Sequence, residues 1–126
     1  MMSILVADDA PGVRKLLRLI LGPGYEVIEA EDGDQALRLM TEHRPDVAIL
    51  DVSMPKRTGI EVCRLLRQDP DLATTGVIVI TANGTPQDQA TALDAGANYF
   101  LTKPFSPGVI IGMVEALLLA RATAVS

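Results

Sequence analysis

Short apolar segments alternate with helical patterns along the chain, and this alternation restricts the fold more than any other feature. Five segments rich in apolar or β-branched residues are expected to form strands: residues 4–7, 25–30, 47–50, 77–80 and 99–101. Four have the composition of buried strands, whereas Tyr25-Glu26-Val27-Ile28-Glu29 alternates as an edge strand does. Because right-handed crossovers carry the chain back across a sheet, strict β-α alternation predicts a doubly wound five-stranded parallel α/β domain with helices on both faces.

Proline, glycine and capping hydroxyls mark the expected helix boundaries. Apolar residues at i, i+3, i+4 and i+7, ending before Gly22, predict the first helix: Val13, Leu16, Leu17 and Ile20. Prolines at positions 45 and 70 follow the second and third helices, predicted over residues 34–43 and 60–68. The fourth helix is expected to begin at Thr85-Pro86 and stop at Gly96, and the fifth to begin at Ser106-Pro107.

Length and composition narrow the classes of protein. The 126 residues fit one domain, predicted over residues 1–121, with residues 122–126 as a loose tail. Eleven Lys and Arg against sixteen Asp and Glu give a net charge of −5 without a basic stripe, so direct nucleic-acid binding is not expected. No apolar run approaches the roughly 18 residues of a membrane span. With one cysteine, Cys63, expected to be buried, a cytoplasmic location is predicted.

Polar residues follow the predicted strands at the edge where parallel sheets bind ligands. They are Asp8, Asp9, Asp51, Thr81, Thr102 and Lys103. Carboxylates about 4 Å apart repel by roughly 4 kcal/mol per pair at an effective dielectric near 20, so a cation is expected among them. Mg²⁺ suits carboxylate oxygens and leaves room for water and a phosphate oxygen. From Asp8 and Asp9 alone, a metal site and a helix cap formed by Asp9 are equally supported.

Asp51 favours the metal site because four apolar residues place its carboxylate at the mouth of a central strand. A nucleophilic carboxylate needs a metal and donors for the incoming phosphoryl oxygens, and Thr81 and Lys103 are suitable donors. Each residue also has an ordinary structural interpretation: Asp51 as a turn or strand-end carboxylate, Thr81 as a common strand-end residue and Lys103 as a surface lysine. A cis peptide at Lys103-Pro104 would fix the direction of the ammonium group, although trans is the expectation for an X-Pro bond.

The ordered set Asp8-Asp9, Asp51, Thr81 and Lys103-Pro104-Phe105 resembles the receiver domain of bacterial two-component response regulators. The resemblance covers essentially the whole chain and implies a flavodoxin-like fold with strand order 2-1-3-4-5. It implies that Asp51 accepts a phosphoryl group from a histidine kinase or phosphotransfer protein. It also implies Mg²⁺ bound by Asp9, Asp51 and the Ser53 carbonyl, with Asp8 acting through water, and phosphoryl oxygens held by Thr81 and Lys103.

The resemblance further implies a switch in which an aromatic residue follows the threonine inward on phosphorylation. That aromatic is Phe100, where tyrosine is frequent in the family, and Tyr99 is expected on the opposite face of the sheet. Phe100 has no hydroxyl that could change partners, so it can only repack. Ser53 and Asn83 occupy positions that tune the lifetime of the phosphoryl group, and Pro104 belongs to the same site.

The last predicted helix is more apolar than one core-facing stripe requires, so part of it is expected to be exposed. The apolar residues are Val109, Ile110, Ile111, Met113, Val114, Leu117, Leu118 and Leu119. Such a surface suits a phosphorylation-dependent homodimer, a downstream partner or a missing output domain. Two other functions remain open: a phosphorylation-independent scaffold, and a phosphohydrolase. The hydrolase is disfavoured by Ser53, where such enzymes need an acid, so the chain is predicted not to be an enzyme.

Overall fold

The computed structural model describes residues 1–125 and contains one five-stranded parallel sheet. The strands are β1 (Ser3–Ala7), β2 (Glu26–Ala30), β3 (Val47–Asp51), β4 (Gly76–Thr81) and β5 (Tyr99–Thr102). The helices are α1 (Pro11–Leu21), α2 (Gly33–His43), α3 (Gly59–Gln68), α4 (Pro86–Asp94) and α5 (Pro107–Val125). The strand order β2-β1-β3-β4-β5 confirms the predicted flavodoxin-like topology.

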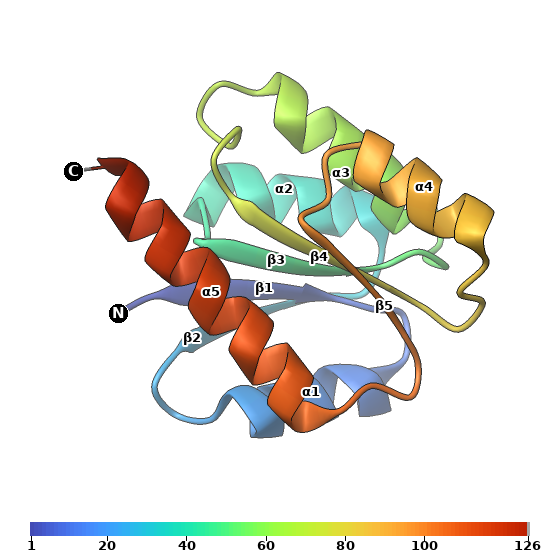
Figure 1. The fold of residues 1–126 in the computed structure, drawn as a ribbon, viewed down its shortest axis with the longest axis horizontal. Helices are drawn as coiled ribbons and strands as arrows, with labels where there is room; N and C mark the ends of the chain where they lie inside the picture. The colour runs from blue at the N-terminus through green and yellow to red at the C-terminus, as the bar shows by residue number, and fades with distance from the viewer. Residues whose placement is uncertain (126) are drawn as a thin grey trace.

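The helices form a layer on each face of the sheet, with α1 and α5 on one face and α2, α3 and α4 on the other (Figure 1). Strand side chains alternate between the two layers. On β1, for example, Leu5 and Ala7 pack with the α2–α4 layer, while Ile4 and Val6 pack with the α1–α5 layer. The central strands β1, β3 and β4 therefore pack between two apolar cores. This packing fixes the positions of their carboxyl ends relative to one another.

Capping side chains fix where the helices begin. Thr58 accepts a hydrogen bond from the Glu61 amide and the Glu61 side chain accepts one from the Thr58 amide, which starts α3 with a capping box at Gly59. Thr85 caps α4 by accepting from the Asp88 amide, as its position before Pro86 predicted. The predicted starts of the second and third helices were one residue late, since both elements include a glycine at their first position.

Helix α5 extends further than predicted. It continues to Val125, through most of the segment 122–126 for which a loose tail was expected, and Ser126 lies outside the described residues. Ala122 and Ala124 favour helix, and the Thr123 hydroxyl donates to the Leu119 carbonyl one turn earlier. The sequence contains no helix breaker after Gly112, so nothing in this segment opposes continuation of the helix.

The surface of α5 confirms the expected excess of apolar side chains. Ile110, Val114 and Leu117 pack against the sheet. Val109, Ile111 and Leu119 are 43%, 37% and 70% exposed. No helix within residues 1–125 is long and apolar enough to cross a membrane.

Candidate functional site

The carboxyl ends of β1 and β3 bring three carboxylates together. Asp8 and Asp9 follow β1 directly, and Asp51 ends β3, which pairs with β1. One carboxylate oxygen from each residue lies within 4.8 Å of the others. Asp8 and Asp51 are only 2% and 4% exposed, whereas Asp9 is exposed. The structure thus places the three acids at one edge of the sheet, where the strand-end argument predicted them.

Asp9 does not cap the following helix. The N-cap residue of α1 is Ala10, which provides no capping side chain, so the alternative role considered for Asp9 is wrong. Asp8 instead orders this turn, since its Oδ1 accepts a hydrogen bond from the Ala10 amide at 2.9 Å. Arg14 Nη1 donates to the Asp8 main-chain carbonyl at 2.6 Å and holds the loop from α1. Asp9 is left with its carboxylate directed to solvent and to the cluster.

Lys103 supplies the positive charge that faces the acids. It follows β5, and its Nζ lies 2.9 Å from Asp8 Oδ2 and 3.5 Å from Asp51 Oδ1. Its main-chain amide donates to the Thr81 carbonyl at 2.8 Å, which aligns the end of β5 with the end of β4. The Lys103-Pro104 peptide is cis, so the expectation of a trans bond was wrong. An X-Pro bond has little intrinsic preference, and tertiary contacts decide its isomer.

The electrostatics of the cluster leave Asp51 poorly compensated. Burial raises the pKa of the Asp51 carboxyl above its ordinary 3.8, and the negative charge of Asp8 raises it further, against the opposing effect of Lys103 and the Ser53 amide. For Lys103, burial alone would lower the pKa, but the hydrogen bond to Asp8 and the charge of Asp51 raise it overall above 10.5. The lysine is therefore a firmly charged ammonium shared between two buried carboxylates.

The remaining predicted residues surround this cluster. Thr81 is buried at the end of β4, and its Oγ1 accepts a hydrogen bond from the Asn83 amide at 3.1 Å. Asn83 and Ser53 are both exposed, on the loops that follow β4 and β3. Pro104 is exposed beside Lys103. The site thus has a buried centre, formed by Asp8, Asp51 and Thr81, and a rim that is open to solvent.

The donor set fits a hard divalent cation. Three carboxylates face one ammonium group, so the cluster retains excess negative charge after Lys103 is counted. All the candidate ligands are oxygen atoms, and Mg²⁺ and Ca²⁺ prefer oxygen to the nitrogen and sulfur ligands that suit zinc. Two of the carboxylates are pre-positioned by burial and one remains accessible, an arrangement that leaves room for water or a phosphate oxygen.

Comparison with known proteins identifies the family. A family model described as the response regulator receiver domain matches residues 4–115. The chain belongs to this family. The response regulator MprA of Mycobacterium sp. (strain KMS) is 43% identical over 116 residues, which cover 91% of this chain and 50% of that protein. The alkaline phosphatase synthesis transcriptional regulatory protein PhoP of Bacillus subtilis (strain 168) is 40% identical over 117 residues, covering 92% and 48%.

A solved structure extends the comparison to a different context. The signal receiver domain of a signal transduction histidine kinase from Syntrophus aciditrophicus superposes with a TM-score of 0.88 at 36% identity, covering 95% of this chain and 92% of that one. Receiver domains act as phosphorylation-dependent switches in two-component systems and are regulators rather than classical enzymes. The receiver domain described here spans about half the length of the curated relatives that it matches.

The aromatic residues of β5 divide between the two faces of the sheet of this receiver domain. Phe100 packs against the core under α2–α4, and Tyr99 packs against the core under α1 and α5. This confirms the prediction from strand alternation that Tyr99 cannot take the place of Phe100. Phe100 is only partly buried.

Two glycines near the site have a packing role that was not predicted, although Gly59 is among the residues that match the family pattern. A Cβ added to Gly59 would overlap the main-chain oxygen of Asp51, so the absence of a side chain lets α3 start directly beneath the end of β3. A Cβ added to Gly84 would overlap Thr102 Cγ2 and lie 3.8 Å from Phe100 Cε2, so Gly84 lets the β4–α4 loop contact β5. In the sequence both resemble ordinary turn glycines, and only the packing reveals the close approach.

Proposed function

We propose that this receiver domain accepts a phosphoryl group on Asp51 from a histidine kinase or phosphotransfer protein. The observation that supports this proposal is the placement of Asp51, whose buried carboxylate lies 3.5 Å from the Lys103 ammonium and within one acidic cluster with Asp8 and Asp9. An Asp51 oxygen attacks phosphorus as the bond from phosphorus to the donor histidine nitrogen breaks. The electron pair returns to the imidazole, and the product is an aspartyl phosphate.

The acidic cluster would hold Mg²⁺ through the carboxylates of Asp8, Asp9 and Asp51 together with the Ser53 main-chain carbonyl. The bound ion would neutralise the charge that develops on the phosphoryl oxygens. Asp8 is already engaged by Lys103 and by the Ala10 amide, so its contribution is expected to pass largely through water. Asp9 has the accessible carboxylate and is the most available direct ligand.

Lys103 and Thr81 would stabilise the phosphorylated state. Lys103 contacts two carboxylates, and the charge that arrives on Asp51 gives its ammonium a stronger partner at the same place. The Thr81 hydroxyl accepts from Asn83, so its own proton is available to donate to a phosphoryl oxygen. Movement of Thr81 toward the phosphoryl group would open space that Phe100 fills by repacking. Ser53 and Asn83, on the open rim, would control the approach of the hydrolytic water.

The output would involve β5 and α5. Exposed apolar side chains on α5 suit a phosphorylation-dependent homodimer, a downstream protein or an output domain elsewhere in a longer chain. Because PhoP is named a transcriptional regulator and the chain spans half its length, an attached output domain is the occupant we favour.

Intact-mass measurement after incubation with acetyl phosphate tests the phosphoacceptor. The expected result is one phosphoryl adduct that forms only with Mg²⁺ and is lost in Asp51→Asn. Asp71→Asn is the matched control, because Asp71 has a 61% exposed side chain, pairs with Arg44 and lies outside the acidic cluster. An adduct that persists in Asp51→Asn would refute the proposal. Failure of the wild type to label while a known receiver labels in parallel would favour a phosphorylation-independent scaffold.

A further inference from the structure

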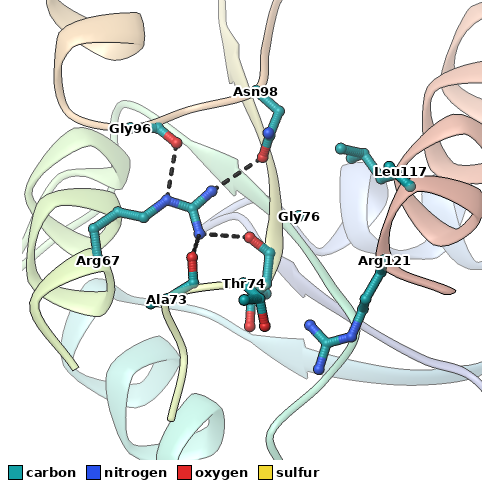
Figure 2. Close-up of a pocket in the computed structure, with 10 residues that line it drawn as sticks. Arg67, Ala73, Thr74, Gly76, Gly96, Asn98, Leu117 and Arg121 are labelled. Carbon is teal, nitrogen blue, oxygen red and sulfur yellow. Dashed lines mark hydrogen bonds between the residues drawn. The ribbon is translucent and has the colours of Figure 1, made fainter. Parts of the chain in front are cut away.

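A cavity of about 480 Å³ lies at the amino end of β4, the opposite end of that strand from Thr81. It is lined by Arg67, Ala73, Thr74, Thr75, Gly76, Gly96, Asn98, Leu117, Ala120 and Arg121. Figure 2 shows Arg67 entering from α3 on one side and Arg121 from α5 on the other. Cavities of this size accommodate small organic molecules. Nothing in the phosphorylation chemistry at Asp51 uses these residues.

Arg67 is held rigidly by neutral acceptors. Its Nε donates to the Gly96 carbonyl at 3.0 Å, and its Nη2 to Asn98 Oδ1 at 3.0 Å. Its Nη1 donates to the Ala73 carbonyl (Figure 2). The same Nη1 also donates to the Thr75 carbonyl. Among residues 1–125 no carboxylate forms an ion pair with Arg67, and burial lowers the pKa of its guanidinium. The charge is therefore oriented by hydrogen bonds but is not neutralised.

Arg121 is only partly satisfied. Its Nε lies 3.4 Å from Asp46 Oδ1, while its Nη1 is buried and has no hydrogen-bond partner within the described part of the chain. Asp46 is also engaged elsewhere, because its Oδ2 accepts from the Ser3 amide at 2.9 Å. A buried donor without an acceptor costs about 1–3 kcal/mol, so this guanidinium is poised to gain from a further acceptor. Of the two arginines, Arg121 thus pairs with one carboxylate, Asp46, and Arg67 pairs with none among the described residues.

We propose that the cavity binds a small organic oxyanion, a phosphate ester or a carboxylate, between Arg67 and Arg121. Guanidinium groups recognise both oxyanions through charged N–H donors. The contacts of Arg67 use four of its five N–H groups, orient the guanidinium before a ligand arrives and leave one Nη2 N–H for the ligand. Asn98 Oδ1 accepts from both Arg67 and the Val77 amide, which assigns the amide nitrogen of Asn98 as a further donor. The apolar part of the ligand would rest on Leu117 and Ala120.

Binding would join α5 to the segment between α3 and β4. Arg67 belongs to α3, whereas Arg121 and Leu117 belong to α5. A ligand that contacts both arginines binds only the folded state, so it raises the unfolding free energy by RT ln(1 + [ligand]/Kd) and raises the unfolding temperature with ligand concentration. The site is independent of Asp51, so its presence does not depend on phosphorylation at the other end of the sheet.

The proposal can be tested by NMR of the arginine Nε–Hε groups in ¹⁵N-labelled protein, in a solution that contains no Mg²⁺. The probes are AMP, succinate and inorganic phosphate, with adenosine as the uncharged counterpart of AMP. We expect saturable shifts of the Arg67 and Arg121 signals with at least one anion and none with adenosine. Shifts with AMP alone would identify the ligand class as a phosphate ester, and shifts with succinate alone would identify it as a carboxylate. Inorganic phosphate that binds as tightly as AMP would show that the site recognises the oxyanion without an organic group, which would overturn the organic-ligand proposal.

Matched variants complete the test. Arg121→Gln should weaken binding at least tenfold, because it removes one of the two guanidinium groups. Arg67→Lys keeps the charge but loses the fork, and it should weaken binding similarly. Arg38→Gln removes one charge from α2, where Arg38 pairs only loosely with Glu42 at 3.8 Å, and it should leave binding unchanged. Equal weakening by Arg38→Gln, or no saturable shift by about 10 mM anion, well above a millimolar dissociation constant, would overturn the proposal.

Discussion

The two ends of the parallel sheet carry opposite charge and hold it by different means. At its carboxyl end, three carboxylates face one ammonium, and the pKa of Asp51 is raised by burial and by Asp8. At its amino end, the Arg121 guanidinium pairs with the carboxylate of Asp46, and the Arg67 guanidinium is surrounded by carbonyl oxygens. The acidic end keeps an excess of negative charge after Lys103 is counted. The basic end spreads its charge over neutral dipoles that also fasten the chain.

This difference concerns rigidity as well as charge. The acids converge because backbone strands end side by side, so their geometry depends on the main chain around Asp51. The basic end converges because one side chain, Arg67, connects two separate loops, the α3–β4 loop and the α4–β5 loop. We therefore expect the acidic end to be most sensitive to changes in backbone spacing, and the basic end to be most sensitive to loss of a single side chain.

The largest effect is expected for Gly59→Ala. The added methyl group overlaps the Asp51 carbonyl, which must move, and overpacking of this kind costs about 3 kcal/mol of unfolding free energy. Urea denaturation should report the loss, and acetyl phosphate labelling of the folded variant should slow with it. Gly112→Ala is the control, because its added methyl group meets nothing within 4 Å. Replacing a glycine inside a helix by alanine should raise the unfolding free energy by about 0.5–1 kcal/mol. Equal stability of Gly59→Ala and wild type would contradict the close approach.

The next effect is expected for Arg67→Met. Removing the guanidinium leaves the carbonyls of Thr75 and Gly96 without this donor, and we expect a loss of about 2 kcal/mol of unfolding free energy. Arg64→Met is the matched control on the same helix. The Arg64 side chain is half exposed and its Nη1 lies 3.9 Å from Asp94 Oδ2, so losing this exposed ion pair should change the unfolding free energy by no more than about 0.5 kcal/mol. If both variants lost the same stability in urea, Arg67 would not be the fastening residue described here.

Sequence reasoning recovered the acidic end far better than the basic end. Asp8, Asp9, Asp51 and Lys103 follow predicted strands, so topology alone was sufficient to bring them together. Arg67 gave no such signal, since its partners are main-chain carbonyls from distant loops, and in the sequence it is one more polar residue on a helix. The same reason hid the packing role of Gly59 and Gly84, which is the space that they leave for Asp51 and Thr102. Contacts to main-chain atoms do not depend on the residue type of the loop that supplies them, so they leave no pattern in the sequence.

A smaller effect, with the opposite sign, is expected for Asp51→Asn at pH 7. The native pKa of Asp51 lies above its ordinary 3.8, so the ionised carboxylate is unfavourable in the folded state, and removing its charge should add about 1 kcal/mol to the unfolding free energy. The gain should shrink as pH falls through the raised pKa toward 3.8, because the wild-type carboxyl then becomes neutral too. Urea titrations of both proteins between pH 7 and acid pH measure this difference. A gain that grew on acidification would reverse the sign of the argument.

The smallest effect is expected for Arg121→Gln without ligand, and it decides whether the two arginines have different roles. Losing the contact with Asp46 is unfavourable, but the variant also removes the buried Nη1 donor that has no partner in the described structure. These changes oppose each other, so the unfolding free energy should stay within about 0.5 kcal/mol of the wild type. Urea denaturation with and without the anion that binds gives the sharper comparison, since the anion should stabilise the wild type and not the variant. A loss comparable to that of Arg67→Met would show that Arg121 fastens the fold as Arg67 does, and that neither arginine is reserved for a ligand.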